Sequence, residues 1–298
     1  MKKIYCTLSV LTLLFASCND NEVFEKEMYK NVVALISSDY HNTFEEVVPL
    51  TGEEVIGYIA ASAGGTEAPT KDMVIGLVED QEPLDSYNWS LFDADENLYA
   101  RVLPREKYEI ADYQIKIAAG ERTGRTMVKI RPDGLSPDST YFIGLKASDM
   151  SGVEINPEKN TILYQVLIKN DYASTAEDSY YSMTGLANAM VTAGNKQLYP
   201  LTQHSVRVIA GTESFQGRVD HIANTSITLD VAADGKVTIK PYKNIQVTQV
   251  DGDERYPNVF RVEESFGRRF NVFLLSYDYV IGNTTRRMQE ELRQEIKR

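Results

Sequence analysis

Apolar and polar residues alternate with a period of two over much of the chain, most clearly in its second half. Residues 226–231 and 236–240 alternate in this way, and Asp234-Gly235 between them is a turn signal. Successive side chains of a strand point to opposite faces, so this stretch predicts an antiparallel hairpin with one solvated face. Residues 205–208 alternate likewise, with Arg207 on the polar side. Other strand-like runs lie at residues 245–247, 259–262 and 270–281. Meandering strands of this kind suit a barrel or a second sandwich.

The first half of the chain consists of short apolar runs separated by turn signals. The runs lie at residues 32–36, 55–61, 74–78, 115–117, 127–130, 141–145 and 162–168. Gly64-Gly65 and Pro132-Asp133-Gly134 mark turns between them. About seven short strands with turns between them are typical of a β-sandwich. Residues 83–97 are polar and aromatic, and we expect them to leave the sandwich as an excursion.

The last fifteen residues have a different pattern. Met288, Leu292 and Ile296 recur every four residues among charged neighbours. This spacing predicts a short helix with one apolar stripe. We interpret it as a helix that caps the second domain, and a helix that binds a partner is the alternative.

Charge and polarity divide the chain into two units. Residues 19–172 hold 28 acidic and 14 basic residues, whereas residues 173–298 hold 15 of each. The segment 169–179 is polar and small, which is typical of an exposed linker. We therefore predict an immunoglobulin-like β-sandwich at residues 31–172 and an antiparallel β-barrel-like domain with the C-terminal helix at residues 173–298. The net charge of −12 argues against nucleic acid as a partner.

The N-terminus has the pattern of an export signal. Lys2 and Lys3 precede an apolar run at residues 8–15, and Ala16-Ser17-Cys18 follows it. This pattern predicts a signal peptide at residues 1–17, because so short a run cannot span a bilayer. The small residues before Cys18 resemble the lipobox of bacterial lipoproteins, which implies cleavage before Cys18 and its acylation. An ordinary secretion signal with an incidental cysteine is the alternative.

Residues 18–30 are polar, and we expect them to form a flexible tether from the lipid. Asp20 and Glu22 lie just after Cys18, and this acidic patch resembles the surface-export signal of Bacteroidetes lipoproteins. The resemblance implies a protein anchored by lipid in the outer membrane and facing the cell exterior. The chain contains two cysteines, Cys6 and Cys18. Since Cys6 lies in the predicted signal peptide, we expect no disulfide in the mature chain.

Motifs for metal or catalytic chemistry are weak in this sequence. The three histidines are not spaced as metal ligands, and we expect neither a metal site nor a cofactor. Residues 93–97 (Asp-x-Asp-x-Asn) begin like a calcium loop, but Leu98 and Pro104 stand where Gly and Glu are needed. A less regular, oxygen-rich calcium site in this segment is the alternative. No nucleophile elbow or phosphate loop occurs, and we expect no enzymatic activity.

Landmarks of the first half resemble a known family. They are Tyr87-Asn88, Leu103-Pro104, Tyr108, Ile110, Ile115, Ile117, Gly120, Gly134-Leu135, Pro137, Tyr141 and Leu145. Together they resemble the adhesin-like domain of unknown function at the N-terminus of many Bacteroidetes surface lipoproteins, over residues 30–170. We expect Tyr141 to pack its ring in the sandwich and to anchor its hydroxyl to the backbone.

The second half is similar to the calycin-like barrel domain that often follows this module. The similarity rests on residues 181–185 and on the pattern Phe273-x-Leu275-x-Tyr277-x-Tyr279. Such two-domain lipoproteins resemble accessory glycan-binding proteins of starch-utilisation-like systems, which act beside outer-membrane transporters. The resemblance implies binding without catalysis.

Glycan binding requires flat aromatic faces and hydrogen-bonding groups beside them. Trp89 is the best single platform in the sequence, but we favour the interpretation of a half-buried tryptophan at the sandwich edge. Five tyrosines of the second domain fall near predicted loops or strand ends: Tyr180, Tyr181, Tyr199, Tyr242 and Tyr256. We expect any glycan site in this second domain, which is neutral and lies away from the lipid.

Two classes of function remain open. The first is a non-catalytic surface lipoprotein that binds glycan for a neighbouring outer-membrane importer. The alternative is a structural or adhesive surface lipoprotein, such as a fimbria-like component, without glycan binding. The sequence identifies no particular glycan.

Overall fold

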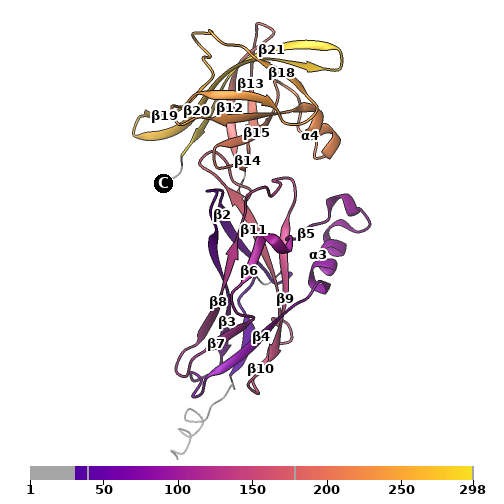
Figure 1. Cartoon of the computed structure of the whole chain (residues 1–298), viewed down its shortest axis with the longest axis vertical. Helices are drawn as coiled ribbons and strands as arrows, with labels where there is room; N and C mark the ends of the chain where they lie inside the picture. Colours follow the sequence, from indigo (N-terminus) through magenta and orange to yellow (C-terminus); the bar gives the residue numbers. More distant parts are fainter. Residues whose placement is uncertain (1–30, 39, 178, 297–298) are drawn as a thin grey trace, which may run out of the picture.

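The computed structural model describes residues 31–38, 40–177 and 179–296, which form an all-β chain of two domains along the long axis of the molecule (Figure 1). The all-β prediction is confirmed. The predicted signal peptide (1–17), the tether (18–30) and Cys18 lie outside the described residues. In the described part of the chain, no helix is both long enough and apolar enough to cross a bilayer.

The first domain is a sandwich of two sheets. Its strands are β1 (Val32–Leu35), β2 (Thr43–Pro49), β3 (Val55–Gly64), β4 (Met73–Glu79), β5 (Arg101–Val102), β6 (Tyr108–Ile110), β7 (Gln114–Ile117), β8 (Thr123–Ile130), β9 (Tyr141–Asp149), β10 (Glu154–Ile155) and β11 (Thr161–Lys169). One sheet has the order β10-β1-β3-β8-β6. The other has the order β2-β11-β9-β4-β7, and β5 pairs with β9.

Alternating side chains of both sheets form the core of the sandwich. On β3, Ile59 and Ala61 are buried, whereas their neighbours in the strand are more exposed. Gly57 lies on the same inward side, and a Cβ there would lie 2.1 Å from the hydroxyl of Tyr164. Glycine thus leaves room for this hydroxyl, which donates a 3.0 Å hydrogen bond to Glu46.

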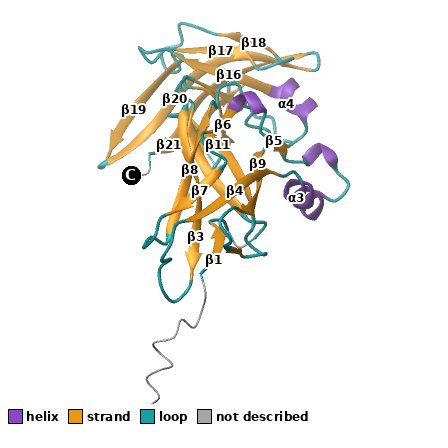
Figure 2. Ribbon diagram, turned by 60° about the horizontal axis from the view of Figure 1, so that its bottom comes forward, coloured by secondary structure: helices purple, strands orange, loops and turns teal. Residues whose placement is uncertain are grey.

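The predicted excursion at residues 83–97 is largely a helix, α3 (Glu82–Phe92), followed by a short 3₁₀ turn, η1 (Glu96–Leu98). Pro83 stands in the first turn, where a missing N–H costs nothing. The amide of Asn88 donates to the carbonyl of Ala100 (3.0 Å) and accepts from its N–H (2.8 Å). These bonds hold α3 against the outside of the sandwich (Figure 2).

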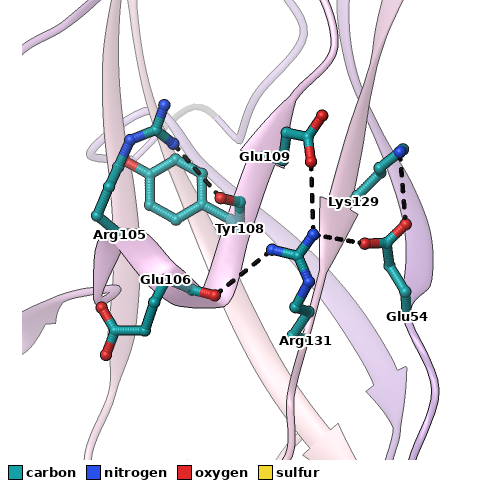
Figure 3. Close-up of polar contacts among 7 residues, drawn as sticks. All are labelled: Glu54, Arg105, Glu106, Tyr108, Glu109, Lys129 and Arg131. Carbon is teal, nitrogen blue, oxygen red and sulfur yellow. Dashed lines mark hydrogen bonds and ion pairs between the residues drawn. The ribbon is translucent and has the colours of Figure 1, made fainter.

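An ion-pair network lies where β6, β8 and β3 meet, beside the 3₁₀ turn η2 (Arg105–Lys107) (Figure 3). Arg131 contacts Glu54 at 2.8 Å and Glu109 at 3.4 Å, and Lys129 lies 3.6 Å from Glu54. Exposed pairs of this kind contribute about 0–1 kcal/mol each. The charged side chains on this face form ion pairs with one another, so we interpret the face as a solvent-exposed surface.

The described residues of the second domain form two antiparallel sheets and one short helix. Its elements are β12 (Tyr180–Ala187), β13 (Met190–Gln197), β14 (Tyr199–Thr202), β15 (Ser205–Ile209), α4 (Val219–Thr225), β16 (Ser226–Val231), β17 (Val237–Pro241), β18 (Gln246–Gln249), β19 (Val259–Ser265), β20 (Arg268–Ile281) and β21 (Thr284–Glu295). The sheet orders are β13-β12-β21-β20-β18, with β19 beside β20, and β14-β15-β16-β17. The two sheets surround one apolar core, which includes Tyr181, Phe273 and Tyr277, in a barrel-like arrangement.

The predicted C-terminal helix is wrong. Residues 284–295 form the strand β21, which pairs with β20 along its whole length and with β12. Met288, Glu290 and Leu292 all point inward, with a period of two. The apolar spacing of four fits a strand as well as a helix. The inward-facing residue between Met288 and Leu292 is the charged Glu290, so the sequence does not show an alternation of apolar and polar residues.

The segment between the domains is a hydrogen-bonded joint and differs from the exposed linker that its composition predicts. The side chain of Asn170 donates to the carbonyls of Thr202 (2.7 Å) and Ser205 (3.0 Å) in the second domain. It also accepts from the N–H groups of Tyr172 and Ala173. Both of these residues are buried. The small polar residues of this segment form hydrogen bonds, so their polarity does not indicate that the segment is exposed to solvent.

Candidate functional site between the two domains

Two aromatic rings of the second domain lie together at its boundary with the first. Tyr199 begins β14, and Phe215 lies in the loop between β15 and α4. Their ring centroids are 5.8 Å apart and the planes are 26° from parallel. Phe215 is 50% exposed, so an apolar ring face is open to solvent. The Tyr199 hydroxyl donates a 2.9 Å hydrogen bond to Gln197. This bond fixes the ring of Tyr199, on which Phe215 is stacked.

A groove lies against these rings and takes its lining from both domains. One part, about 290 Å³, is lined by residues 135–141 and 165–168 of the sandwich and by Tyr199, Phe215 and Ile222 of the second domain. A second part, about 360 Å³, lies between Pro137, residues 174–177 and Tyr199. Tyr199 borders both parts. We name this space the interdomain groove.

The loop at residues 136–141 forms the first-domain wall of the groove. The backbone N–H of Ser136 donates to the hydroxyl of Tyr141 (3.3 Å), so the expected anchoring of Tyr141 to the backbone is confirmed. Residues 136, 139 and 140 carry hydroxyl groups, and Gln165 adds an amide to the same wall. The groove therefore combines aromatic faces with neutral hydrogen-bonding groups.

Arg207 lies beneath the aromatic pair and ties the two domains together. Its guanidinium lies 4.2 Å from the ring centre of Tyr199 and 5.3 Å from that of Tyr242. It also forms an ion pair with Asp138 of the groove loop. Among the residues that the structure describes, the Nε and Nη2 atoms of Arg207 have no hydrogen-bond partner. A buried cation of this kind depends strongly on its carboxylate, so Asp138 is held firmly at the groove.

The structure gives the five predicted tyrosines different environments. Tyr199 and Tyr242 both contact Arg207, and Tyr199 lines the groove. Tyr180 is exposed on β12 and is not part of the groove lining. Tyr181 is fully buried, donates to the carbonyl of Tyr172 (2.8 Å), and has a pKa raised by that burial. Tyr256 is only 4% exposed. Neither Tyr181 nor Tyr256 has a free ring face, so the structure does not support these two as glycan platforms.

Trp89 lies on the outer side of α3 and is 63% exposed. The favoured interpretation, a half-buried tryptophan at the sandwich edge, is therefore wrong. Its neighbour Leu91 is also exposed, whereas Leu84 and Asn88 hold the helix to the sheet. Trp89 offers an exposed flat ring and is not among the residues that line the interdomain groove.

Phe215 and the loop at residues 136–141 were missed by the sequence analysis. Phe215 stands in a loop without periodic pattern, and its partner Tyr199 is sixteen positions away. Pro137 and Tyr141 were recognised as landmarks of the fold but not as parts of a site. Nothing local in the sequence indicates that this loop meets the second domain.

The described part of the chain contains no cluster of three or more His, Cys, Asp or Glu side chains able to hold a metal ion. The calcium-like segment is a turn in which the carboxylate of Asp95 accepts from the backbone and side-chain nitrogens of Asn97 (both 3.2 Å). The Asp95 carboxylate therefore stabilises the turn itself.

Two family models match the chain, one for each half. A model described as an N-terminal domain matches residues 24–154, and a model described as a C-terminal domain matches residues 160–293. No curated protein matches the chain.

Several solved structures share the fold at low identity. A protein of unknown function from Bacteroides ovatus is 16% identical with a TM-score of 0.67, over 89% of this chain and 91% of that one. A multidomain protein including DUF1735 from the same organism is 15% identical with a TM-score of 0.62, over 88% and 94%. An auxiliary nutrient binding protein from Bacteroides thetaiotaomicron is 13% identical with a TM-score of 0.59, over 87% and 94%. The chain thus has the two-domain β fold of these Bacteroides proteins.

Proposed function

We propose that this chain is a non-catalytic surface lipoprotein that binds glycan for a neighbouring outer-membrane importer. In this proposal the acyl chains on Cys18 anchor the protein in the outer membrane, and residues 19–30 carry the two domains away from it. More than one acyl chain gives stable anchoring. The interdomain groove is the proposed glycan site.

The observation that carries the proposal is the aromatic pair at the groove. The exposed ring of Phe215 is stacked on Tyr199 beside a wall of hydroxyl and amide groups. An aromatic face packs against the C–H side of a pyranose, and neighbouring polar groups bind its hydroxyls. The relative from Bacteroides thetaiotaomicron is named an auxiliary nutrient binding protein, which agrees with this role.

A structural or adhesive role is the second candidate, and exposed apolar tips favour it. Phe266 is fully exposed at the turn between β19 and β20, in the left-handed region at φ 51°. Met190 and Val191 are exposed at the start of β13. Large apolar side chains at hairpin tips are typical of contacts with another protein.

Binding without turnover distinguishes these roles. The mature chain without lipid (residues 19–298) is run through native gels that contain single polysaccharides, and the same mixtures are assayed for released reducing ends. We expect retarded migration with at least one glycan and no new reducing ends. Affinity in a shallow groove should be on the order of 1 µM to 1 mM. Unchanged migration in every glycan would favour the adhesive role, and released reducing ends would indicate a glycosidase.

A further inference from the structure

The ring of Phe215 is carried by the loop at residues 210–218, between β15 and α4, which we name the Phe215 loop. We infer that two carboxylates of the second domain, Glu290 and Glu213, are positioning residues that hold this loop in place for glycan binding. This inference rests on the proposed function and adds the residues that position its aromatic platform. It is carried by two hydrogen-bonded links between the loop and the strands β20 and β21.

The first link joins the start of the Phe215 loop to the buried ion pair of the barrel. The backbone N–H of Gly211 donates to the hydroxyl of Tyr277 (2.8 Å), and that hydroxyl donates to Oε1 of Glu290 (2.7 Å). Lys196 donates to the same oxygen at 2.8 Å. Because an N–H group can only donate, the single proton of the Tyr277 hydroxyl is directed to Glu290. A charged acceptor strengthens such a hydrogen bond, so Glu290 fixes the group to which the loop is bound.

A glycine at position 211 allows the loop to lie this close to β20. Gly211 has a φ of 55°, and a Cβ at this position would lie 1.9 Å from the hydroxyl oxygen of Tyr279. Any other residue would therefore meet both backbone strain and a steric clash. The close approach places the Gly211 N–H within reach of Tyr277, two residues before Tyr279 on the same face of β20.

The second link holds the middle of the Phe215 loop. The carboxylate of Glu213 accepts from Arg286 of β21 and from the hydroxyl of Tyr279 (3.4 Å). The Glu213 side chain is only 18% exposed, and partly buried ion pairs are screened less than exposed ones. In addition, Nε2 of His221 in α4 donates to the carbonyl of Ser214 at 2.8 Å. Positions 211, 213 and 214, just before Phe215, are thus each bound by a side chain from outside the loop.

These links matter because the ring of Phe215 is itself half exposed. An exposed ring is restrained less by its own packing than a buried one, so the backbone of the loop sets where the ring lies against Tyr199. A platform that is already in its binding position takes up a ligand without the entropy cost of ordering a loop. Loss of either link should therefore weaken glycan binding while the barrel stays folded.

The test removes one hydroxyl from the first link. Tyr277→Phe keeps the ring and deletes the group between Gly211 and Glu290. The matched control is Tyr181→Phe, because Tyr181 is buried in the same core, bonds the carbonyl of Tyr172 and does not line the groove. Residues 19–298 of each protein are titrated calorimetrically with oligosaccharides of glucose, mannose, galactose and xylose. Tyr277→Phe should weaken binding about three- to fivefold, and Tyr181→Phe less than about twofold.

The second link has its own pair of variants. Glu213→Gln removes the charge that binds Arg286, and Glu263→Gln removes a carboxylate that pairs with Arg293 on β21, outside the loop. We expect Glu213→Gln to weaken glycan binding about three- to fivefold and Glu263→Gln to leave it within about twofold of the wild type.

Hydrogen exchange reads the position of the loop without any glycan. Exchange is followed by mass spectrometry in peptides that cover residues 210–218 and, for comparison, residues 226–240. Tyr277→Phe and Glu213→Gln should exchange several-fold faster in the first peptide only, because local opening requires less free energy when a link is lost. Tyr181→Phe and Glu263→Gln should exchange like the wild type in the first peptide.

The outcomes separate this inference from the function on which it rests. Wild-type exchange in the Phe215 loop of Tyr277→Phe and Glu213→Gln would show that the two links do not hold it. Faster exchange with unchanged glycan affinity would remove their role in binding. Equally weakened binding in Tyr277→Phe and Tyr181→Phe would assign the effect to a general loss of stability and overturn the inference. Binding of none of the oligosaccharides by the wild type would overturn the proposed function itself, together with the role in binding assigned to these residues.

Discussion

The ammonium of Lys196 lies 2.8 Å from Oε1 of Glu290, and both side chains are buried in the second domain. Lys196 belongs to β13 and Glu290 to β21, with β12 between these strands. The same Glu290 oxygen accepts a 2.7 Å hydrogen bond from Tyr277, whose hydroxyl accepts from the N–H of Gly211 (2.8 Å). Burial lowers the pKa of Lys196 from its usual value, and the nearby Glu290 opposes that shift.

Removing one member of this pair should destabilise the protein strongly. Glu290→Ala leaves the buried Lys196 without its carboxylate, and we expect a loss of about 3–5 kcal/mol in the free energy of unfolding. The double variant Lys196→Met with Glu290→Leu removes both charges and should recover most of this loss. Urea unfolding of the three proteins measures the effect. Equal losses in the single and double variants would show that the pair is not the cause.

Acid should weaken the link between β19 and β21. Arg293 donates to Glu263 at 2.6 Å and Arg261 donates to it at 2.7 Å. These bonds, that from Arg293 first, lower the pKa of Glu263 below its ordinary 4.5. The unfolded chain then binds more protons near pH 4, so this stabilisation is present above pH 4.5 and is lost as pH falls through the folded pKa.

The variant Glu263→Gln should therefore lose about 0.5–1 kcal/mol of unfolding free energy at pH 7. The difference from the wild type should shrink as the pH falls below the folded pKa. Its neighbour Glu264 is exposed, and Glu264→Gln serves as the control. Unfolding curves from pH 3 to pH 7 that show the same pH dependence in both variants would contradict this assignment.

The joint between the domains should resist proteases. Since Asn170 connects the joint to Thr202 and Ser205, we expect wild-type protein to remain uncut between residues 170 and 177 under limited proteolysis. Asn170→Ala should admit cleavage there and yield fragments of about 150 and 120 residues. Asn156→Ala removes a hydrogen bond to Glu158 in a sandwich loop and should leave the joint intact. Rapid cleavage of the wild-type joint would indicate separable domains.

The lipid anchor can be tested by fractionating cells. We expect wild-type protein in the outer-membrane pellet and Cys18→Ala outside it, because the proposed acylation requires the Cys18 thiol. Cys6→Ala, inside the predicted signal peptide, should fractionate like the wild type. A Cys18→Ala variant that remains in the pellet would refute the anchor.

Local alternation was enough to predict the fold class and many strands. The hairpin at Asp234-Gly235 is β16–β17, with Val231 opposite Val237. Errors arose where a distant residue changes the environment of a position. The sequence alone predicts that Glu290 faces solvent, whereas in the structure it is buried beside Lys196. Arg207 falls on the polar side of its strand, yet Asp138 of the other domain covers it.

The candidate site was less predictable for the same reason. Among the predicted tyrosines, Tyr199 lines the groove, but residue type alone could not separate it from the buried Tyr181. The sequence also placed the site in the second domain alone, whereas the loop at residues 136–141 supplies one wall. A groove between domains depends on their packing, which leaves no periodic pattern in the sequence.

The most direct test of glycan binding at the groove compares two aromatic truncations. A neutral oligosaccharide bound by the mature chain is titrated calorimetrically against the wild type, Phe215→Ala and Trp89→Ala, whose mutated rings are both exposed. Loss of a stacking ring is worth roughly 1–1.5 kcal/mol, so Phe215→Ala should weaken binding about tenfold. Trp89→Ala should change the dissociation constant by less than about twofold. Unchanged affinity in Phe215→Ala together with abolished binding in Trp89→Ala would contradict the groove and assign the glycan to α3.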